Sequence, residues 1–149
     1  MRAVVQRVQE AWVSVNGRRV GEITQGLLIY LGVHVSDQTA DSDYLVEKIL
    51  GLRIFEDAAA RMNLSLTQVT GALLVVSQFT LHGDCRKGKR PSFAEAAAPE
   101  RARDLYEYFV SRCSERGIKT QTGIFREMMQ VGSINAGPVT LLLDSHKRF

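Results

Sequence analysis

The sequence predicts a protein of the α+β class, with a largely antiparallel or mixed sheet and two main helices in a single domain spanning residues 1–149. Strand-like segments fill residues 1–35, two segments with helical spacing follow, and the helices do not alternate regularly with the strands. The length of 149 residues is the usual size of one domain, and no repeat, low-complexity tract or linker divides the chain.

The N-terminal third is rich in predicted strands. Met1–Val8 is strand-like, and residues 11–15 alternate apolar with more polar positions, as in a half-buried strand. Asn16-Gly17 favours a type I′ hairpin turn, after which Arg18–Ile23 returns as the second strand of the hairpin. Gly26–Val35 is almost entirely apolar, which predicts a strand covered on both faces.

Two later segments carry apolar residues at helical intervals. A helix is expected over residues 41–52, where Asp41 or Ser42 can cap the first turn. A second, more strongly patterned helix has Pro99 in its first turn and Gly117 after its end.

The remaining apolar segments are short enough to be strands. They are Arg53–Glu56, Ala72–Leu81, Ile118–Phe125, Met128–Ile134 and Val139–Asp144. Asn135-Ala136-Gly137-Pro138 separates the last two, and its residue types favour an ordinary hairpin turn.

The composition restricts the class of protein. Apolar residues make up 45% and charged residues 23%, as in ordinary folded domains, and no apolar run reaches the roughly 18 to 20 residues that span a bilayer. No secretory signal pattern opens the chain, so we expect a cytoplasmic location without a membrane partner. Cys85 and Cys113 are expected to be free thiols, and we expect no metal and no cofactor because no zinc-type or nucleotide-type motif is present. The net charge of +3 and the pI near 9.1 mildly favour an anionic partner.

One apolar segment turns polar at its end, where catalytic groups could gather. Leu73–Leu81 delivers Ser77, Gln78 and Thr80 to the point where a buried strand meets solvent. If the strand continued, Thr80 and His82 would share one face and could form a nucleophile and base. The alternative, that these side chains only satisfy backbone groups at a strand end, is the more common case.

A basic loop follows this segment. Arg86, Lys87, Lys89 and Arg90 lie within a few residues of each other, and Phe93 is close behind them. Such a loop can bind a phosphate backbone while the aromatic ring stacks on a base. A solvated loop without a ligand is an equally good interpretation.

Two strings resemble the signatures of the D-aminoacyl-tRNA deacylase family. They are Ser77-Gln78-Phe79-Thr80-Leu81 and Asn135-Ala136-Gly137-Pro138-Val139-Thr140. The resemblance runs along the whole chain and also includes Met1-Arg2-Ala3-Val4-Val5-Gln6-Arg7-Val8, Gly26-Leu27-Leu28, Leu31-Gly32-Val33, Leu52-Arg53-Ile54-Phe55, Met62-Asn63, Arg90-Pro91-Ser92-Phe93 and Thr122-Gly123.

The resemblance implies a β-barrel-like homodimer with its active sites at the subunit interface. In it, the catalytic segment Ser77, Gln78, Phe79 and Thr80 lines a pocket for the 3′-terminal adenosine that carries the amino acid. The Gly137-Pro138 peptide is expected to be cis and to reach into the partner's pocket, with Met129 packed near it. Backbone carbonyls there would hold the substrate amino group and exclude an L side chain, so D-aminoacyl-tRNA and glycyl-tRNA, but no DNA, are the expected partners.

The implied reaction is proofreading hydrolysis of the aminoacyl ester. It needs an activated water and donors for the tetrahedral oxyanion, for which the backbone N–H groups of Phe79 and Thr80 are candidates. The terminal 2′-hydroxyl of the RNA is expected to assist the water, which leaves the role of Thr80 open.

The chain departs from the family pattern near the second signature. Ala136 stands where an acidic residue is common, Arg126-Glu127-Met128 replaces smaller residues ending in an acid, and Ala60-Arg61 replaces Gly-Lys. Ala136 keeps open a deacylase with relaxed chirality. Two further alternatives are a non-catalytic RNA-binding module that uses the basic loop and an esterase with Thr80 as nucleophile.

Overall fold

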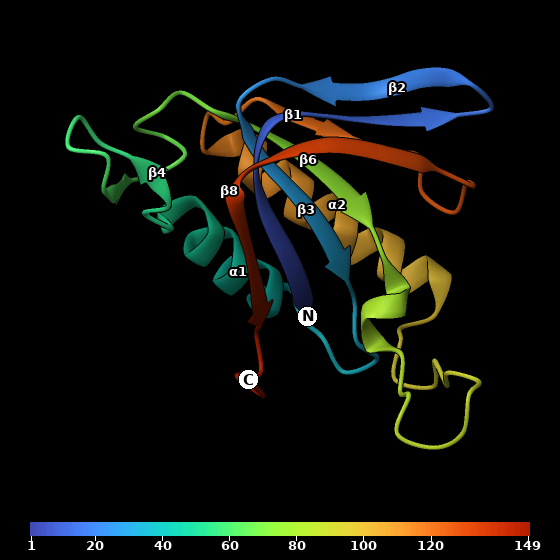
Figure 1. Cartoon of the computed structure of the whole chain (residues 1–149). Helices are drawn as coiled ribbons and strands as arrows, with labels where there is room; N and C mark the ends of the chain where they lie inside the picture. The colour runs from blue at the N-terminus through green and yellow to red at the C-terminus, as the bar shows by residue number, and fades with distance from the viewer.

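The computed structural model describes all residues from Met1 to Phe149 (Figure 1). Its strands are β1 (Arg2–Val15), β2 (Arg18–Ile23), β3 (Gly26–Gly32), β4 (Phe55–Glu56), β5 (Met62–Leu64), β6 (Ala72–Ser77), β7 (Thr120–Thr122) and β8 (Gln130–Asp144). The helices are α1 (Thr39–Gly51) and α2 (Pro99–Glu115), and a short 3₁₀ helix, η1, spans Phe79–His82. None of the helices is long and apolar enough to cross a membrane.

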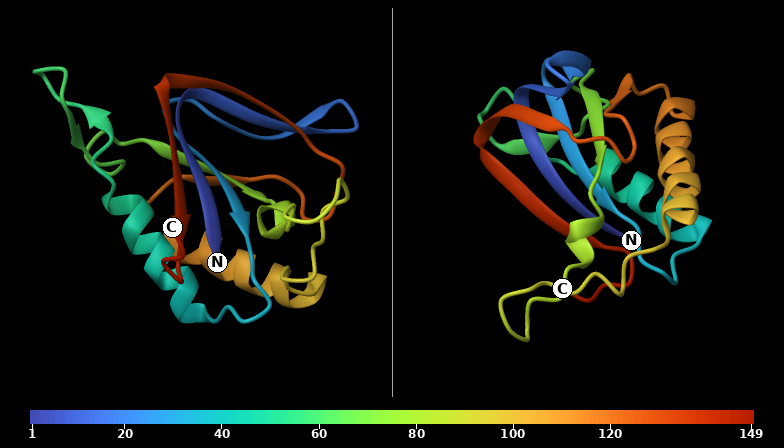
Figure 2. Two further views of the ribbon diagram at one scale, coloured as in Figure 1. Left: turned by 60° about the horizontal axis from the view of Figure 1, so that its bottom comes forward. Right: turned by 90° about the vertical axis from the view of Figure 1, so that its right-hand side faces the viewer.

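A mixed six-stranded sheet forms most of the molecule, which confirms the predicted α+β class. Strand β1 pairs antiparallel with β2, β3 and β8, whereas β3, β6 and β7 run parallel to one another. The sheet curls into a nearly closed barrel, because β2 crosses close to β7. The crossing requires glycine: a Cβ on Gly21 would lie 2.3 Å from the carbonyl oxygen of Thr122. Figure 2 shows this curled sheet with both helices packed along one side.

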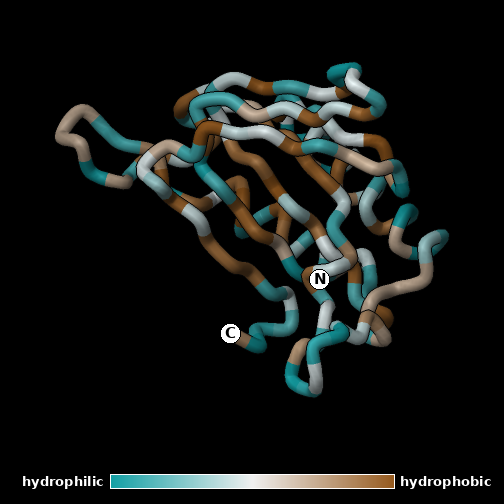
Figure 3. Tube along the Cα trace, turned by 45° about the vertical axis from the view of Figure 1, so that its right-hand side comes forward, coloured by the Kyte–Doolittle hydropathy of each residue, from teal (hydrophilic) through white to brown (hydrophobic).

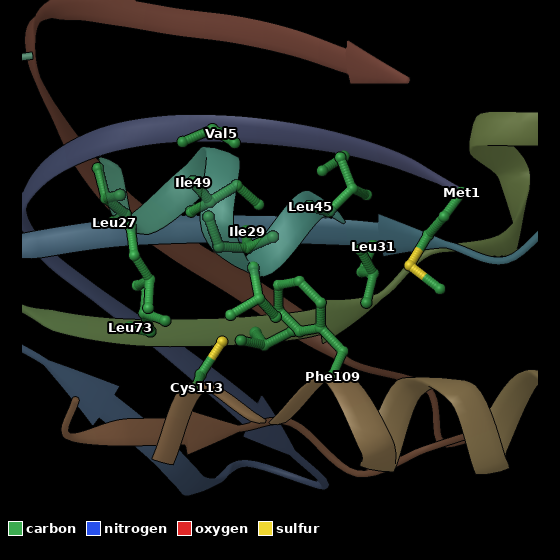
Figure 4. Packing of buried hydrophobic residues seen from close by; sticks show 14 of the residues in the cluster. Met1, Val5, Leu27, Ile29, Leu31, Leu45, Ile49, Leu73, Phe109 and Cys113 are labelled. Carbon is green, nitrogen blue, oxygen red and sulfur yellow. The ribbon is translucent and has the colours of Figure 1, made fainter. Parts of the chain in front are cut away.

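The central strands β3 and β6 are apolar throughout because each of their faces is covered. Leu27, Ile29 and Leu31 on one face join the larger hydrophobic cluster, which also contains the buried side chains of α1 and α2. Figure 4 shows this packing around Phe109. On the opposite face, Leu28 joins a second cluster inside the barrel with residues of β1, β2 and β6. The continuous apolar run predicted a strand covered on both faces, and the structure confirms this.

Both predicted helices are present. Helix α2 begins at Pro99 and is followed by Gly117 at a φ of +77°, as expected for a helix C-terminus. Helix α1 begins at Thr39, two residues before the predicted start. Asp41 caps the first turn as predicted, but from its third position: its carboxylate accepts a hydrogen bond of 2.8 Å from the backbone N–H of Gln38.

Several predicted strands are shorter than their apolar segments. Strand β3 ends at Gly32, β6 ends at Ser77, and only Phe55–Glu56 and Thr120–Thr122 of the other two segments are in strands. These segments end where they lose a pairing partner; apolar side chains beyond those points still contribute to the core. In contrast, residues 2–15 form one uninterrupted strand, β1.

The prediction of a hairpin turn at Asn135-Ala136-Gly137-Pro138 was wrong. Both halves of β8 pair with β1, with Asn135 opposite Val8 and Thr140 opposite Gln6. Only Arg7 therefore faces residues 136–139, which bulge out of the ladder and form what we call the Gly-Pro segment. Strand β8 turns a sharp corner between its two halves (Figure 2).

Candidate active site

A cavity of about 640 Å³ opens at the end of β6, where the polar segment begins. Its walls come from β6 and η1, from residues 93–102 before and in the first turn of α2, and from residues 125–129 before β8. Eleven of its 16 lining residues are hydrophobic. An apolar cavity with a few polar groups at one side is the usual form of a small-molecule site.

The predicted catalytic segment lies at this cavity, with one exception. Ser77, Gln78 and Phe79 line it, whereas Thr80 is exposed beside it and its hydroxyl accepts a hydrogen bond from the Gln78 amide. Strand β6 stops here because the N–H of Gln78 donates the last hydrogen bond to β3, at Leu31. The first N–H groups of the following η1 helix, those of Phe79 and Thr80, have no carbonyl partner within that helix.

The possible pairing of Thr80 with His82 on one strand face does not form, because both residues lie in η1 rather than in a strand. The His82 ring is buried, with 2% of the residue exposed, and neither ring nitrogen has a hydrogen-bond partner. Burial lowers the pKa of His82. The structure therefore does not assemble a threonine nucleophile with His82 as its base.

The basic loop adjoins the cavity through its aromatic residue. Phe93 lines the cavity and packs edge-on against Phe79, with ring centroids 5.1 Å apart. Arg86 forms two side-chain hydrogen bonds with Asp84, of 2.7 and 2.8 Å, and these hold the pKa of that carboxyl well below its usual range. Three exposed cations without an ion pair remain, namely Lys87, Lys89 and Arg90. Figure 3 shows the loop as a hydrophilic extension of the molecule.

The Gly-Pro segment does not line the cavity of its own chain. The Gly137–Pro138 peptide bond is cis, as the resemblance implies. Met129 does line the cavity, and it packs on the barrel cluster.

Arg7 supports the Gly-Pro segment, a role that the sequence analysis missed. Its guanidinium is buried and donates hydrogen bonds of 2.8 Å to the carbonyl of Ala136 and 2.6 Å to that of Ile54. Its third contact is with Glu56 at 3.7 Å. The available signal was a charged residue at a buried position of an alternating strand, because Arg7 continues the series Ala3 and Val5.

A second buried charged group joins the two ends of the chain, and we call it the chain-end cluster (Met1, His34, Asp37 and His146). The ligand atoms of His34, Asp37 and His146 lie within 4.8 Å of one another, a spacing that a metal ion could use. However, Asp37 already binds the Met1 ammonium group at 2.6 Å and accepts the His34 backbone N–H at 2.6 Å. His146 lies 3.3 Å from Asp37 and 3.2 Å from Asp41, so the carboxylates have cationic or N–H partners within the chain.

Fold and site together define a class of small α+β proteins with a nearly closed barrel, two helices on one side, and an apolar cavity at the end of a central strand. The family model described as D-Tyr-tRNA(Tyr) deacylase matches residues 4–144. The chain belongs to this family.

Individual relatives agree with this assignment. A protein of Koribacter versatilis (strain Ellin345) named D-aminoacyl-tRNA deacylase is 58% identical, and one of the same name from Thermosipho africanus (strain TCF52B) is 56% identical, each over all of both chains. The solved structure of a "c-Myc DNA Unwinding Element Binding Protein" superimposes with a TM-score of 0.92 at 37% identity, covering 97% of this chain and 98% of that one. The structure of "a probable eukaryotic D-amino acid tRNA deacylase" has a TM-score of 0.82 at 18% identity, covering 95% and 97%, and shows the shared fold.

Proposed function

We propose that this chain is an editing enzyme that hydrolyses the ester of D-aminoacyl-tRNA to free amino acid and tRNA. The observation that carries this proposal is the full-length match, at 56 to 58% identity, to proteins named D-aminoacyl-tRNA deacylase. The cavity beside Ser77–Phe79 supports it, because it offers an apolar site with polar groups at one side.

The cavity is the proposed binding site for the 3′-terminal adenosine that carries the amino acid. Phe79 and Phe93 provide aromatic surface at one side, and a base can stack on such rings in any sequence context. Ser77 and Gln78 provide the polar groups that orient the sugar and the ester. The three free cations of the basic loop, Lys87, Lys89 and Arg90, would bind phosphates further along the RNA, with Arg86 held by Asp84.

Ester hydrolysis in this site uses backbone groups and the substrate. The N–H groups of Phe79 and Thr80 stand at the start of η1 and are the proposed oxyanion donors. The terminal 2′-hydroxyl of the RNA is the proposed assistant for the attacking water, since the buried His82 ring makes no hydrogen bond and the Thr80 hydroxyl bonds the Gln78 amide instead. Thr80 then contributes by holding Gln78, and Thr80→Ala should lower kcat about tenfold rather than abolish activity.

Rejection of L-aminoacyl esters is the proposed role of Gly137 and Pro138, in the cavity of a partner subunit. The Gly-Pro segment lies outside its own chain's cavity, so in this proposal a second copy supplies it. Strand β8 is a long strand that pairs only with β1, and Ile134 and Leu142 on it are 46% and 61% exposed. An exposed apolar strand of this kind is suited to a symmetric contact between two copies. A rigid backbone carbonyl pair would then admit D-amino acids and glycine, and Met129 would pack beside it.

The oligomer can be tested apart from the chemistry. Leu142→Asp should convert a dimer into monomers in sedimentation experiments and remove deacylase activity, because each cavity loses its Gly-Pro segment. A variant that is monomeric and still fully selective would refute the interface.

The decisive experiment follows amino acid release from matched D-aminoacyl-, L-aminoacyl- and glycyl-tRNA under one salt condition. Fast loss of the D and glycyl esters with the L ester spared supports the proposal. Equal loss of all three favours a deacylase of relaxed chirality, and RNA binding without turnover favours a non-catalytic module. A cytoplasmic location, where tRNA is charged, is part of the same proposal.

A further inference from the structure

Arg126 stands at the rim of the cavity in a backbone conformation that arginine rarely adopts. Its φ is +68°, and among the non-glycine residues with positive φ it is the only one that lines the cavity. The N–H of Glu127 donates a hydrogen bond of 3.2 Å to the carbonyl of Ile124, which closes a four-residue turn with Arg126 in the third position. A turn with positive φ at only that position is of type II and normally has glycine there. Backbone strain of this kind clusters at functional sites, and here it lies at the cavity.

The turn is fixed by the residue that precedes Arg126. Phe125 packs against Tyr106, with ring centroids 5.8 Å apart, and the guanidinium of Arg103 lies 5.2 Å above the ring of Phe125. Phe125 also lines the cavity. The guanidinium of Arg126 therefore extends from an anchored turn and not from a free loop.

The Arg126 side chain is exposed and has no partner within the chain. It forms no ion pair and no side-chain hydrogen bond, and its neighbour Glu127, although at the same rim, lies beyond salt-bridge distance from it. Arg86, in the neighbouring basic loop, does not line the cavity and is paired with Asp84. Arg126 is the one arginine of the cavity wall, and all its donors are available.

We propose that Arg126 binds the phosphate that joins the terminal adenosine to the nucleotide before it. This inference rests on the proposed function, which places that adenosine in the cavity. The 5′ phosphate of that adenosine is one sugar away from its base, so the RNA backbone that continues from it passes over the rim of the cavity. A guanidinium matches a phosphate with two parallel hydrogen bonds, which favours arginine over lysine at such a position.

The test compares two substrates that share the ester but differ in the phosphate. One is D-aminoacyl-tRNA, and the other is adenosine esterified with the same D-amino acid, which has no phosphate. Arg126→Ala and Arg126→Gly should each raise KM for the tRNA about tenfold, with kcat/KM for the nucleoside ester unchanged. The salt dependence of log KM for the tRNA should become shallower by about 0.7, as for one lost contact on a single strand.

The Arg126→Gly variant distinguishes the effect of backbone strain from the effect of losing the charge. Arg126→Gly relieves the positive φ and should raise the melting temperature, while its KM defect matches that of Arg126→Ala. Arg126→Lys should recover only part of the affinity. Arg61, an exposed arginine in the β4–β5 turn, provides the matched control: Arg61→Ala removes the same charge and should leave KM unchanged.

Equal losses on both substrates, or no loss on the tRNA, would overturn the role of Arg126 alone. If the wild-type chain hydrolyses neither ester, the proposed function and this inference fail together, so the two kinds of failure are distinguishable.

Discussion

The chain-end cluster and the surroundings of Arg7 are two buried charged groups with different consequences. Asp37 is completely buried, and it meets a cation, the Met1 ammonium group, together with the N–H of His34. Arg7 is nearly as buried, but its short contacts are with two carbonyl oxygens, and its acidic neighbour Glu56 is mostly exposed. Asp37 joins the two ends of the chain to α1, whereas Arg7 holds one bulge of β8.

The two charged residues differ in which buried groups lose their partner when the residue is replaced. Removing Asp37 leaves a buried ammonium group without its counter-charge, which is costly. Removing Arg7 leaves two carbonyls and one solvated carboxylate, which costs less, but frees the Gly-Pro segment. A buried charge thus stabilises the fold at Asp37 and positions the Gly-Pro segment at Arg7.

Asp37→Asn should have the largest effect on stability. Loss of the carboxylate's charge beside Met1 is expected to lower the free energy of unfolding by about 3–5 kcal/mol. Urea unfolding followed by circular dichroism measures this, and deacylation per folded molecule should be unchanged. Asp41→Asn is the control: it also faces His146 but is partly exposed, so it should cost less than about 1 kcal/mol. A loss of activity in folded Asp37→Asn would erase the contrast with Arg7.

Arg7→Met should have the opposite profile. Removal of the hydrogen bond to the Ala136 carbonyl frees the Gly-Pro segment, and a displacement of about 1 Å can cost 100-fold in rate. We expect about that loss in kcat/KM for D-aminoacyl-tRNA, with only about 1–2 kcal/mol lost in unfolding free energy. Arg7→Lys should recover part of the activity, because lysine cannot reach both carbonyls with a planar fork. Glu56→Gln, which changes the exposed contact, should leave both quantities near wild type.

Gly137→Ala acts on the same segment from the other side. The φ of Gly137 is +133°, and an added Cβ would lie 2.8 Å from Val139 Cγ2 and 2.9 Å from Arg7 Nη2. We expect about a tenfold loss of activity and a smaller ratio of D to L hydrolysis, measured on matched esters. Gly51→Ala, at the end of α1 with no atom within 4 Å of the new Cβ, should be neutral. In the double variant with Arg7→Met the losses should be less than additive, because both changes displace one segment.

Local chemistry made much of the fold predictable from the sequence. The Asn16-Gly17 turn forms as expected, with φ values of +50° and +76°, because the strands on either side pair with each other. Asn135–Pro138 has similar turn residues, but the strands beside it pair with β1 instead, so no hairpin forms. A turn signal specifies a hairpin only where the flanking strands are partners, and that is a non-local property.

The candidate site was predictable in part for the same reason. Ser77, Gln78 and Phe79 lie at the cavity because an apolar strand that becomes polar marks the edge of a buried sheet. The change from strand to 3₁₀ helix after Ser77 depends on where β3 ends, and it rules out the pairing of Thr80 with His82 that a longer strand would have allowed. The hydrogen bonds of Arg7 join residues 47 and 129 positions apart, and the contact of Asp37 with Met1 joins residues 36 positions apart, so no spacing within the sequence reveals them.

Lowering the pH should have the smallest effect on stability, and it should act through Asp144, which is bonded to His146 of the chain-end cluster, and not through the surroundings of Arg7. Burial raises the pKa of Asp144, but hydrogen bonds from Arg2 and the His146 backbone, with the nearby Met1 ammonium group, hold it below its ordinary value of 3.8. The unfolded chain therefore takes up a proton on this carboxyl before the folded chain does. The resulting stabilisation is complete above pH 3.8 and is lost as the pH falls through the lower pKa of the folded state.

Urea unfolding between pH 6 and pH 2.5 should therefore show a steeper decline for the wild type than for Asp144→Asn. Arg7→Met should keep nearly the wild-type slope, because the two carbonyl oxygens that accept hydrogen bonds from Arg7 do not titrate, and its carboxylate neighbour Glu56 is mostly exposed at 3.7 Å. If Arg7→Met flattened the acid decline as much as Asp144→Asn does, Arg7 would also act through a carboxylate, and the division between a stabilising and a positioning charge would fail.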